Sequence, residues 1–182
     1  MAYTAPRTWV AGEVVTASQM NTHVRDNISY LYGIQGANEL WVPATRLLDS
    51  GSSTPMGARG YFPVAQLYDA NDAAYVSWKC PGNFSSITTA VMVLIPQVTQ
   101  AAADLDIYTQ YGAIGEAYTT NAESDTASTY NLTQWQLFGV DFSGVLAALA
   151  ADDYVACVLW LGNSAHDVDV VGFHMKYVPL TS

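Results

Sequence analysis

The sequence has few charged residues and very few basic ones. Of its 182 residues, 12% are charged, whereas soluble domains usually have about 25%. The 6 Lys+Arg stand against 16 Asp+Glu, which gives a formal net charge of −10. The only lysines are Lys79 and Lys176, so no basic patch can form that would displace counterions from nucleic acid. We therefore expect no nucleic-acid partner.

Long apolar runs are also absent. The run Ala90–Ile95 ends at Pro96, and Tyr154–Leu161 ends at Gly162, whereas a membrane-spanning helix needs about 20 apolar residues. The N-terminus lacks the basic residues followed by an apolar stretch that mark a secretory signal. We therefore expect neither a membrane partner nor a signal peptide.

Cysteine is scarce. Cys80 and Cys157 lie far apart in the sequence, and their spacing fits no zinc motif. In a chain made in a reducing cytosol we expect buried free thiols, while strands that brought the two together would allow a disulfide.

Apolar and neutral polar residues dominate what is present. Half of the residues are hydrophobic, and 12 are tyrosine. Such a chain can build a substantial core, and its neutral, aromatic surface suits contact with other proteins or with sugars. Residues 1–36 carry no net charge, so residues 37–182 carry all of the −10. This shift predicts an N-terminal arm with a helix, 1–36, followed by a β-domain, 37–182.

The segment Thr16-Ala17-Ser18-Gln19 has the pattern of a helix-capping box. Apolar residues then recur with helical spacing, and Gly33 or Gly36 is expected to end the helix. A lone amphipathic helix of about fifteen residues is marginal in water. Its apolar stripe must therefore dock either on the chain's own sandwich or on a neighbouring subunit. The stripe consists of Met20, Val24, Ile28 and Leu31, and Trp9 is a further large anchor upstream.

The stretch from Thr8 to Asn27 resembles a segment that recurs at the N-termini of tailed-bacteriophage virion proteins of the decoration, head-fibre and tail-associated types. The matching positions are Trp9, Gly12, Glu13, Thr16, Met20, Asn21, Arg25, Asp26 and Asn27. The resemblance implies that residues 1–36 anchor the chain to other virion proteins of the capsid or tail. It also implies a homo-oligomer, a trimer, located in a virion that assembles in the host cytoplasm.

After Gly36, short runs rich in β-branched and aromatic residues alternate with turn residues. This pattern predicts a mainly β fold, a jelly-roll-like antiparallel β-sandwich of two four-stranded sheets, preceded by an extended arm and one N-terminal α-helix. The expected strands are 40–47, 60–68, 74–80, 86–95, 105–111, 129–138, 153–161 and 169–178. Because Tyr154–Leu161 is apolar throughout, we expect both faces of that strand to be covered, either centrally in a sheet or at a subunit contact.

Motifs of catalysis are missing. The chain has no nucleophile elbow, phosphate loop, dinucleotide fingerprint or His-Glu zinc motif. His174 lies in a predicted strand and is expected to be a structural residue. We predict a non-enzymatic protein with no catalytic residues and no cofactor.

Two carboxylate pairs, Asp104 with Asp106 and Asp167 with Asp169, have spacing that puts both members on one side of an extended segment. They could supply oxygen ligands for Ca²⁺. No repeat or EF-hand spacing supports that use, so we interpret them as solvated carboxylates and predict no metal.

Tyrosines are concentrated around residues 108–118. Tyr108, Tyr111 and Tyr118 form the expected exposed cluster and the candidate glycan-binding residues. They support an alternative function, a carbohydrate-binding receptor module of a phage tail or fibre. A further alternative is a self-polymerising filament subunit, with the arm of one copy inserted in the next.

Overall fold

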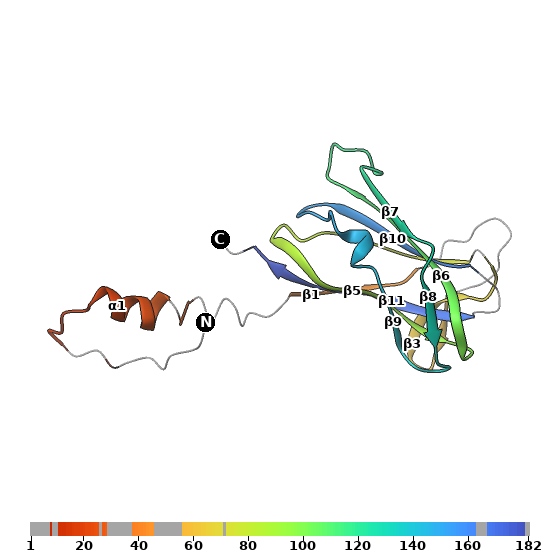
Figure 1. The fold of residues 1–182 in the computed structure, drawn as a ribbon, viewed down its shortest axis with the longest axis horizontal. Coiled ribbons are helices and arrows are strands. Elements are labelled where there is room, and N and C mark those ends of the chain that lie inside the picture. The colour runs from red at the N-terminus through yellow and green to blue at the C-terminus, as the bar shows by residue number, and fades with distance from the viewer. Residues whose placement is uncertain are drawn as a thin grey trace. The chain divides into compact units, whose positions relative to one another are not determined.

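The computed structural model describes Thr8 and residues 11–25, 27–28, 38–45, 56–70, 72–162 and 167–180. The chain separates into two compact units, one of which ends at Asn38 while the other spans Glu39–Leu180. Figure 1 shows the short helix in the first unit and the strands of the second.

The N-terminal helix begins as the capping box predicts. Helix α1 spans Ala17–Met20 and continues into a π-helical turn, Asn21–Arg25. The Thr16 amide donates to Gln19 Oε1 (2.8 Å), and the Gln19 amide donates to Thr16 Oγ1 (3.3 Å). The predicted helix end at Gly33 or Gly36 lies outside the described residues. Within the part of the chain that the structure describes, no helix has the length and apolar character that a membrane crossing requires.

The second unit is built from two antiparallel sheets, which confirms the predicted mainly β sandwich. The six-stranded sheet has the order β2-β3-β11-β5-β9, with β1 also paired to β11, and the five-stranded sheet has the order β4-β10-β6-β7, with β8 also paired to β6. The strands are β1 (Asn38–Pro43), β2 (Met56–Arg59), β3 (Phe62–Leu67), β4 (Ala73–Lys79), β5 (Phe84–Pro96), β6 (Gln100–Gly112), β7 (Asn121–Asp125), β8 (Thr129–Leu132), β9 (Phe138–Asp141), β10 (Tyr154–Leu161) and β11 (Val168–Pro179).

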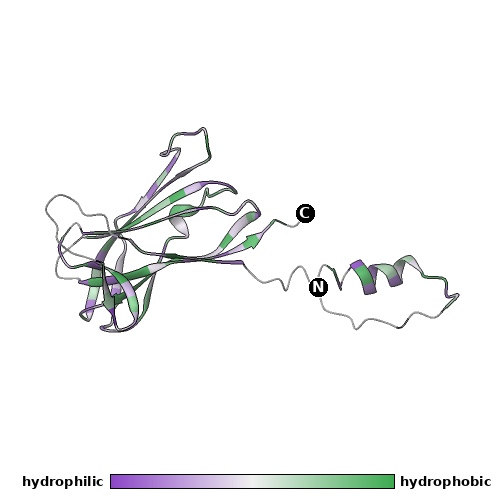
Figure 2. Ribbon diagram, turned by 180° about the vertical axis from the view of Figure 1, so that it is seen from behind, coloured by the Kyte–Doolittle hydropathy of each residue, from purple (hydrophilic) through white to green (hydrophobic). Residues whose placement is uncertain are grey.

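The inward faces of the two sheets form one apolar core. Trp78 of β4 stacks on Phe173 of β11, with ring centroids 4.5 Å apart, so the two sheets meet at this pair. Apolar and polar residues alternate along the strands (Figure 2), as expected where one sheet face is buried and the other is not.

The strand count differs from the predicted two sheets of four. The segment that forms β7 was predicted to be a turn. Its sequence, Asn-Ala-Glu-Ser-Asp, has no β-branched or aromatic residue that would indicate a strand. It becomes a strand by pairing with β6. Strand β2 was not predicted either. It contains Gly57, and a glycine is needed there because a Cβ atom would lie only 2.5 Å from the Gln66 side chain. The predicted strand 129–138 is interrupted, and Trp135 lies in the break with a φ of 63°.

Strand β10 is central in its sheet, as predicted, but within this chain only one of its faces is covered. Its residues alternate between buried and less buried positions instead of being covered on both faces. Val155, Cys157, Leu159 and Leu161 face the core, whereas Tyr154 and Trp160 are 50% and 37% exposed. A central strand therefore presents apolar side chains to the outside.

Both cysteines are buried and unpaired, which confirms the expected free thiols. Burial raises the pKa of the Cys80 thiol to about 12 and also raises the pKa of Cys157. Neither thiol is a reactive nucleophile at neutral pH.

Candidate functional site

Three apolar side chains of the N-terminal helix are exposed. Met20, Val24 and Ile28 have exposed fractions of 47%, 37% and 48%, and their spacing of four residues places them on one side of the helix. The predicted stripe is present at these three positions.

Gly12, Glu13 and Asn27 of the N-terminal pattern determine the local backbone and hydrogen bonds around the helix. Gly12 has a φ of +83°, which a residue with a Cβ rarely adopts. Glu13 Oε1 accepts a hydrogen bond from Gln19 Nε2 (3.5 Å), which links the turn to the capping box. Asn27 is buried and donates from Nδ2 to the His23 carbonyl oxygen (3.3 Å).

Other positions of the pattern are placed more simply. Thr16 caps α1, and Asn21 and Arg25 begin and end the π-helical turn. Trp9, Asp26 and Leu31 lie outside the described residues.

The outer face of the five-stranded sheet, on the far side from the core, is the second candidate site. Directly opposed residues of antiparallel strands lie on the same face. The register forms two rows across four strands, Tyr75–Val158–Tyr108–Ser124 and Ser77–Ala156–Gln110–Ala122. We call the surface formed by these rows together with Tyr154, Trp160 and Asp106 the β10 face.

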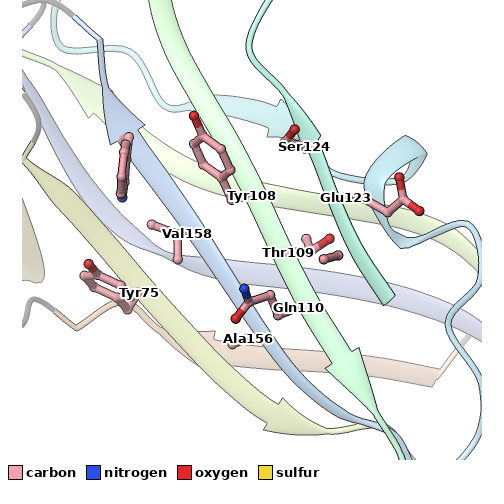
Figure 3. Close-up of a pocket in the computed structure, with 10 residues that line it drawn as sticks. Tyr75, Tyr108, Thr109, Gln110, Glu123, Ser124, Ala156 and Val158 are labelled. Atoms are coloured by element: carbon pink, nitrogen blue, oxygen red, sulfur yellow. The ribbon is translucent and has the colours of Figure 1, made fainter. Parts of the chain in front are cut away.

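A hollow of about 360 Å³ lies over the β10 face (Figure 3). The rings of Tyr108 and Trp160 lie side by side in it, with centroids 5.0 Å apart and planes tilted by 52°. The Gln110 side chain extends from β6 beside Ala156. Glu123 borders the hollow, but its side chain points away from Tyr108.

Three polar side chains of the β10 face are unpartnered in the part of the chain that the structure describes. Among the residues that the structure describes, neither the hydroxyl groups of Tyr75 and Tyr108 nor the side-chain amide of Gln110 makes a hydrogen bond. Burial, and then the charge of Asp106, raise the pKa of Tyr108, so its hydroxyl stays protonated. These groups are free to donate and accept hydrogen bonds with a ligand.

The charges of the β10 face lie at its two ends. At one end Asp106 is opposite Trp160, and burial raises the pKa of its carboxyl, with further contributions from Asp104 and Asp125. No cationic side chain in the described ranges pairs with Asp106. At the other end Lys79 forms an ion pair with Asp152, so its charge is already balanced.

The three predicted glycan-binding tyrosines do not lie together. Tyr108 lies on the β10 face. Tyr111 is fully buried, so the expectation of an exposed Tyr111 is wrong; its hydroxyl oxygen accepts a hydrogen bond from the Ala148 amide (3.3 Å). Tyr118 is 77% exposed and borders a second hollow of about 380 Å³.

Tyr75, Gln110 and Trp160 were not among the predicted glycan-binding residues, although they lie on the β10 face. The sequence signal for an outward face of β10 was the two-residue period within Tyr154–Leu161. It was hidden because Ala156 and Val158, which lie on the outer face, are themselves apolar.

One carboxylate of the Asp167 and Asp169 pair, that of Asp169 on β11, has a structural role. Asp169 is fully buried, so the interpretation as a solvated carboxylate is wrong for this residue. It accepts hydrogen bonds from Arg59 Nε (2.7 Å), from the Tyr68 hydroxyl (2.9 Å) and from the Gln97 amide. Over the described ranges, no group of three or more His, Cys, Asp or Glu side chains is arranged to hold a metal ion.

Comparisons with known proteins show distant similarity to solved structures. No family model and no curated protein matches the sequence. A similar solved structure is the CBM36-1 domain of a multidomain xylanase from the hindgut metagenome of Trinervitermes trinervoides. It is 14% identical, the match covers 76% of this chain and 97% of that one, and the TM-score is 0.44.

Proposed function

We propose that this protein is a non-enzymatic structural protein of a tailed-phage virion, of the decoration or fibre type. Residues 1–36 bind other virion proteins of the capsid or tail, and the β-sandwich is displayed outward. One observation carries the proposal: the exposed side chains of Met20 and Val24 lie within the segment that resembles virion proteins, and the exposed Ile28 follows it directly.

The energetics of such an anchor are favourable. Full burial of a side chain of this kind contributes roughly 1.5–3 kcal/mol, and these three are already about half buried. A homotrimer presents three stripes, and linking them raises the overall affinity without new contacts.

The proposal is tested with the double variant Met20→Asp/Val24→Asp in the full-length chain. Particles assembled without the protein are incubated with each purified variant and sedimented. We expect the double variant to stay in the supernatant, because two carboxylates in the stripe would have to be desolvated on binding. Ser18→Asp, an exposed site on α1, is the control and should sediment with the particles. Equal sedimentation of all variants would refute the anchor.

Light scattering of the purified chain separates this role from self-polymerisation. We expect a discrete oligomer, a trimer, at all concentrations. Filaments that the stripe variant disperses would identify a filament subunit instead.

The β10 face supports a second candidate function, carbohydrate recognition by the displayed sandwich. The specific observation is that Tyr75, Tyr108 and Gln110 combine apolar contact area with polar groups that make no hydrogen bond over the described ranges. Sugars offer apolar C–H faces and hydroxyl groups together, so they match this chemistry.

A glycan array tests carbohydrate recognition. We expect binding that Tyr108→Ala weakens by about tenfold or more, which corresponds to about 1.4 kcal/mol. Tyr61→Ala removes a fully exposed tyrosine outside the β10 face and should bind like the parent chain. An array without signal would exclude this function and leave the virion role untouched.

A further inference from the structure

We infer that the β10 face takes an extended, uncharged oligosaccharide that lies along strand β10. This inference rests on the proposed carbohydrate recognition and specifies the length and the charge of the ligand.

The β10 face is long rather than compact. Tyr154 and Trp160 are six positions apart on β10, which corresponds to about 20 Å along an extended strand. The second hollow continues the first, because both are bordered by Gln110 and Ala156. It ends beside Tyr118 and Tyr154. Several sugar units are needed to fill such a track.

The chemistry of the face changes across the strands. Along its centre, β10 presents the apolar side chains of Ala156 and Val158 between two aromatic rings. On either side, β4 and β6 contribute hydroxyl and amide groups, those of Tyr75 and Ser77 and those of Tyr108 and Gln110. A chain of sugar rings can place its C–H faces over β10 and its hydroxyl groups over the flanking strands.

A peptide that adds a strand is a poor occupant of this face. β10 pairs with β4 along Tyr154–Trp160 and with β6 along Tyr154–Leu161, so its backbone groups are already used. An occupant contacts the centre of the face through side chains alone, whereas strand addition needs a free sheet edge.

Charge selects against acidic sugars. Asp106 faces outward beside Trp160 without a cationic partner in the described part of the chain, and Asp104 lies on the same side of β6. At the other end, Asp152 balances Lys79. A carboxylate or sulfate on the ligand would meet uncompensated negative charge at one end and no free cation at the other.

Length is tested by calorimetric titration with a series from mono- to hexasaccharide of the neutral sugar that gives the strongest array signal. We expect affinity to rise with each unit until the track is filled. Trp160→Ala and Tyr154→Ala should each weaken the hexasaccharide by about tenfold and should make the hexasaccharide no tighter than a shorter chain. Tyr61→Ala is the control. Equal affinity for a disaccharide and a hexasaccharide would overturn the inferred length.

Charge is tested by comparing neutral glycans with sialylated and polyuronic glycans on the same array. We expect at least a tenfold preference for neutral ligands, and Asp106→Asn should reduce that preference by raising the affinity for acidic ligands. Thermal unfolding verifies that each variant is folded. Acidic glycans that bind as well as neutral ones would overturn this inference while carbohydrate recognition stands. An array with no signal at all would overturn the proposed recognition itself, and the inference with it.

Discussion

The outer faces of the two sheets differ in the burial and the hydrogen bonding of their side chains. On the six-stranded sheet, Val64, Ile95 and Val171 form a small buried cluster, and Asp169 receives three hydrogen bonds from its neighbours. On the five-stranded sheet, aromatic rings face outward, and the hydroxyl groups of Tyr75 and Tyr108 make no hydrogen bond to any residue that the structure describes. One face contributes to stability, and the other is available for binding.

The largest effect is expected from two aspartates that both lie on strands, one on each face. Asp169→Ala should lower the free energy of unfolding by about 3 kcal/mol, because Arg59, Tyr68 and Gln97 lose their common acceptor. Asp106→Ala should change it by less than about 0.5 kcal/mol, because Asp106 pairs with no cation in the described ranges. Urea unfolding of both variants makes the comparison. Equal losses would show that the two faces do not differ in this way.

A smaller effect is expected from two tyrosines. Tyr68→Phe should cost about 1 kcal/mol, because its hydroxyl donates to Asp169 (2.9 Å). Tyr108→Phe should leave stability within about 0.3 kcal/mol, because its hydroxyl has no protein partner among the described residues, but it should weaken glycan binding. A stability loss at Tyr108 as large as that at Tyr68 would remove the distinction.

The smallest effect concerns pH. The pKa of Asp106 is raised by burial first and by Asp104 and Asp125 next, so the charged carboxylate destabilises the fold. The folded state then binds more protons than the unfolded state between the ordinary and the raised pKa, and stability falls as pH rises through that window. Asp106→Asn should therefore be more stable than the parent at neutral pH by less than about 1 kcal/mol. The gain should shrink as pH falls through the raised pKa, and a gain that did not depend on pH would contradict this account.

Patterns within a few consecutive residues were sufficient to predict the start of the N-terminal helix and the mainly β fold. The capping box of Thr16 and Gln19 involves residues three apart, and the structure confirms it. Strand patterns likewise predicted a mainly β sandwich. β7 could not be found in this way, because its polar residues become a strand only through pairing with β6.

The candidate site was predicted less well, for a geometric reason. Tyr108 and Tyr111 are three residues apart on one strand, and an odd spacing puts their side chains on opposite faces. Tyr108 accordingly faces the ligand side, while Tyr111 lies in the core. Tyr75 and Trp160 join Tyr108 only through the register of β4 and β10 with β6, which no local pattern encodes.

The central position of β10 also determines how ligand binding would be observed. Its amides are hydrogen bonded within a sheet on both sides, so hydrogen exchange there requires opening of the whole sandwich rather than local fraying. A ligand that binds to this strand contacts side chains whose backbone is already ordered. The binding site is lost only when the whole sandwich unfolds. Even weak binding at saturating ligand should therefore slow exchange across both sheets together and raise the melting temperature as a single transition.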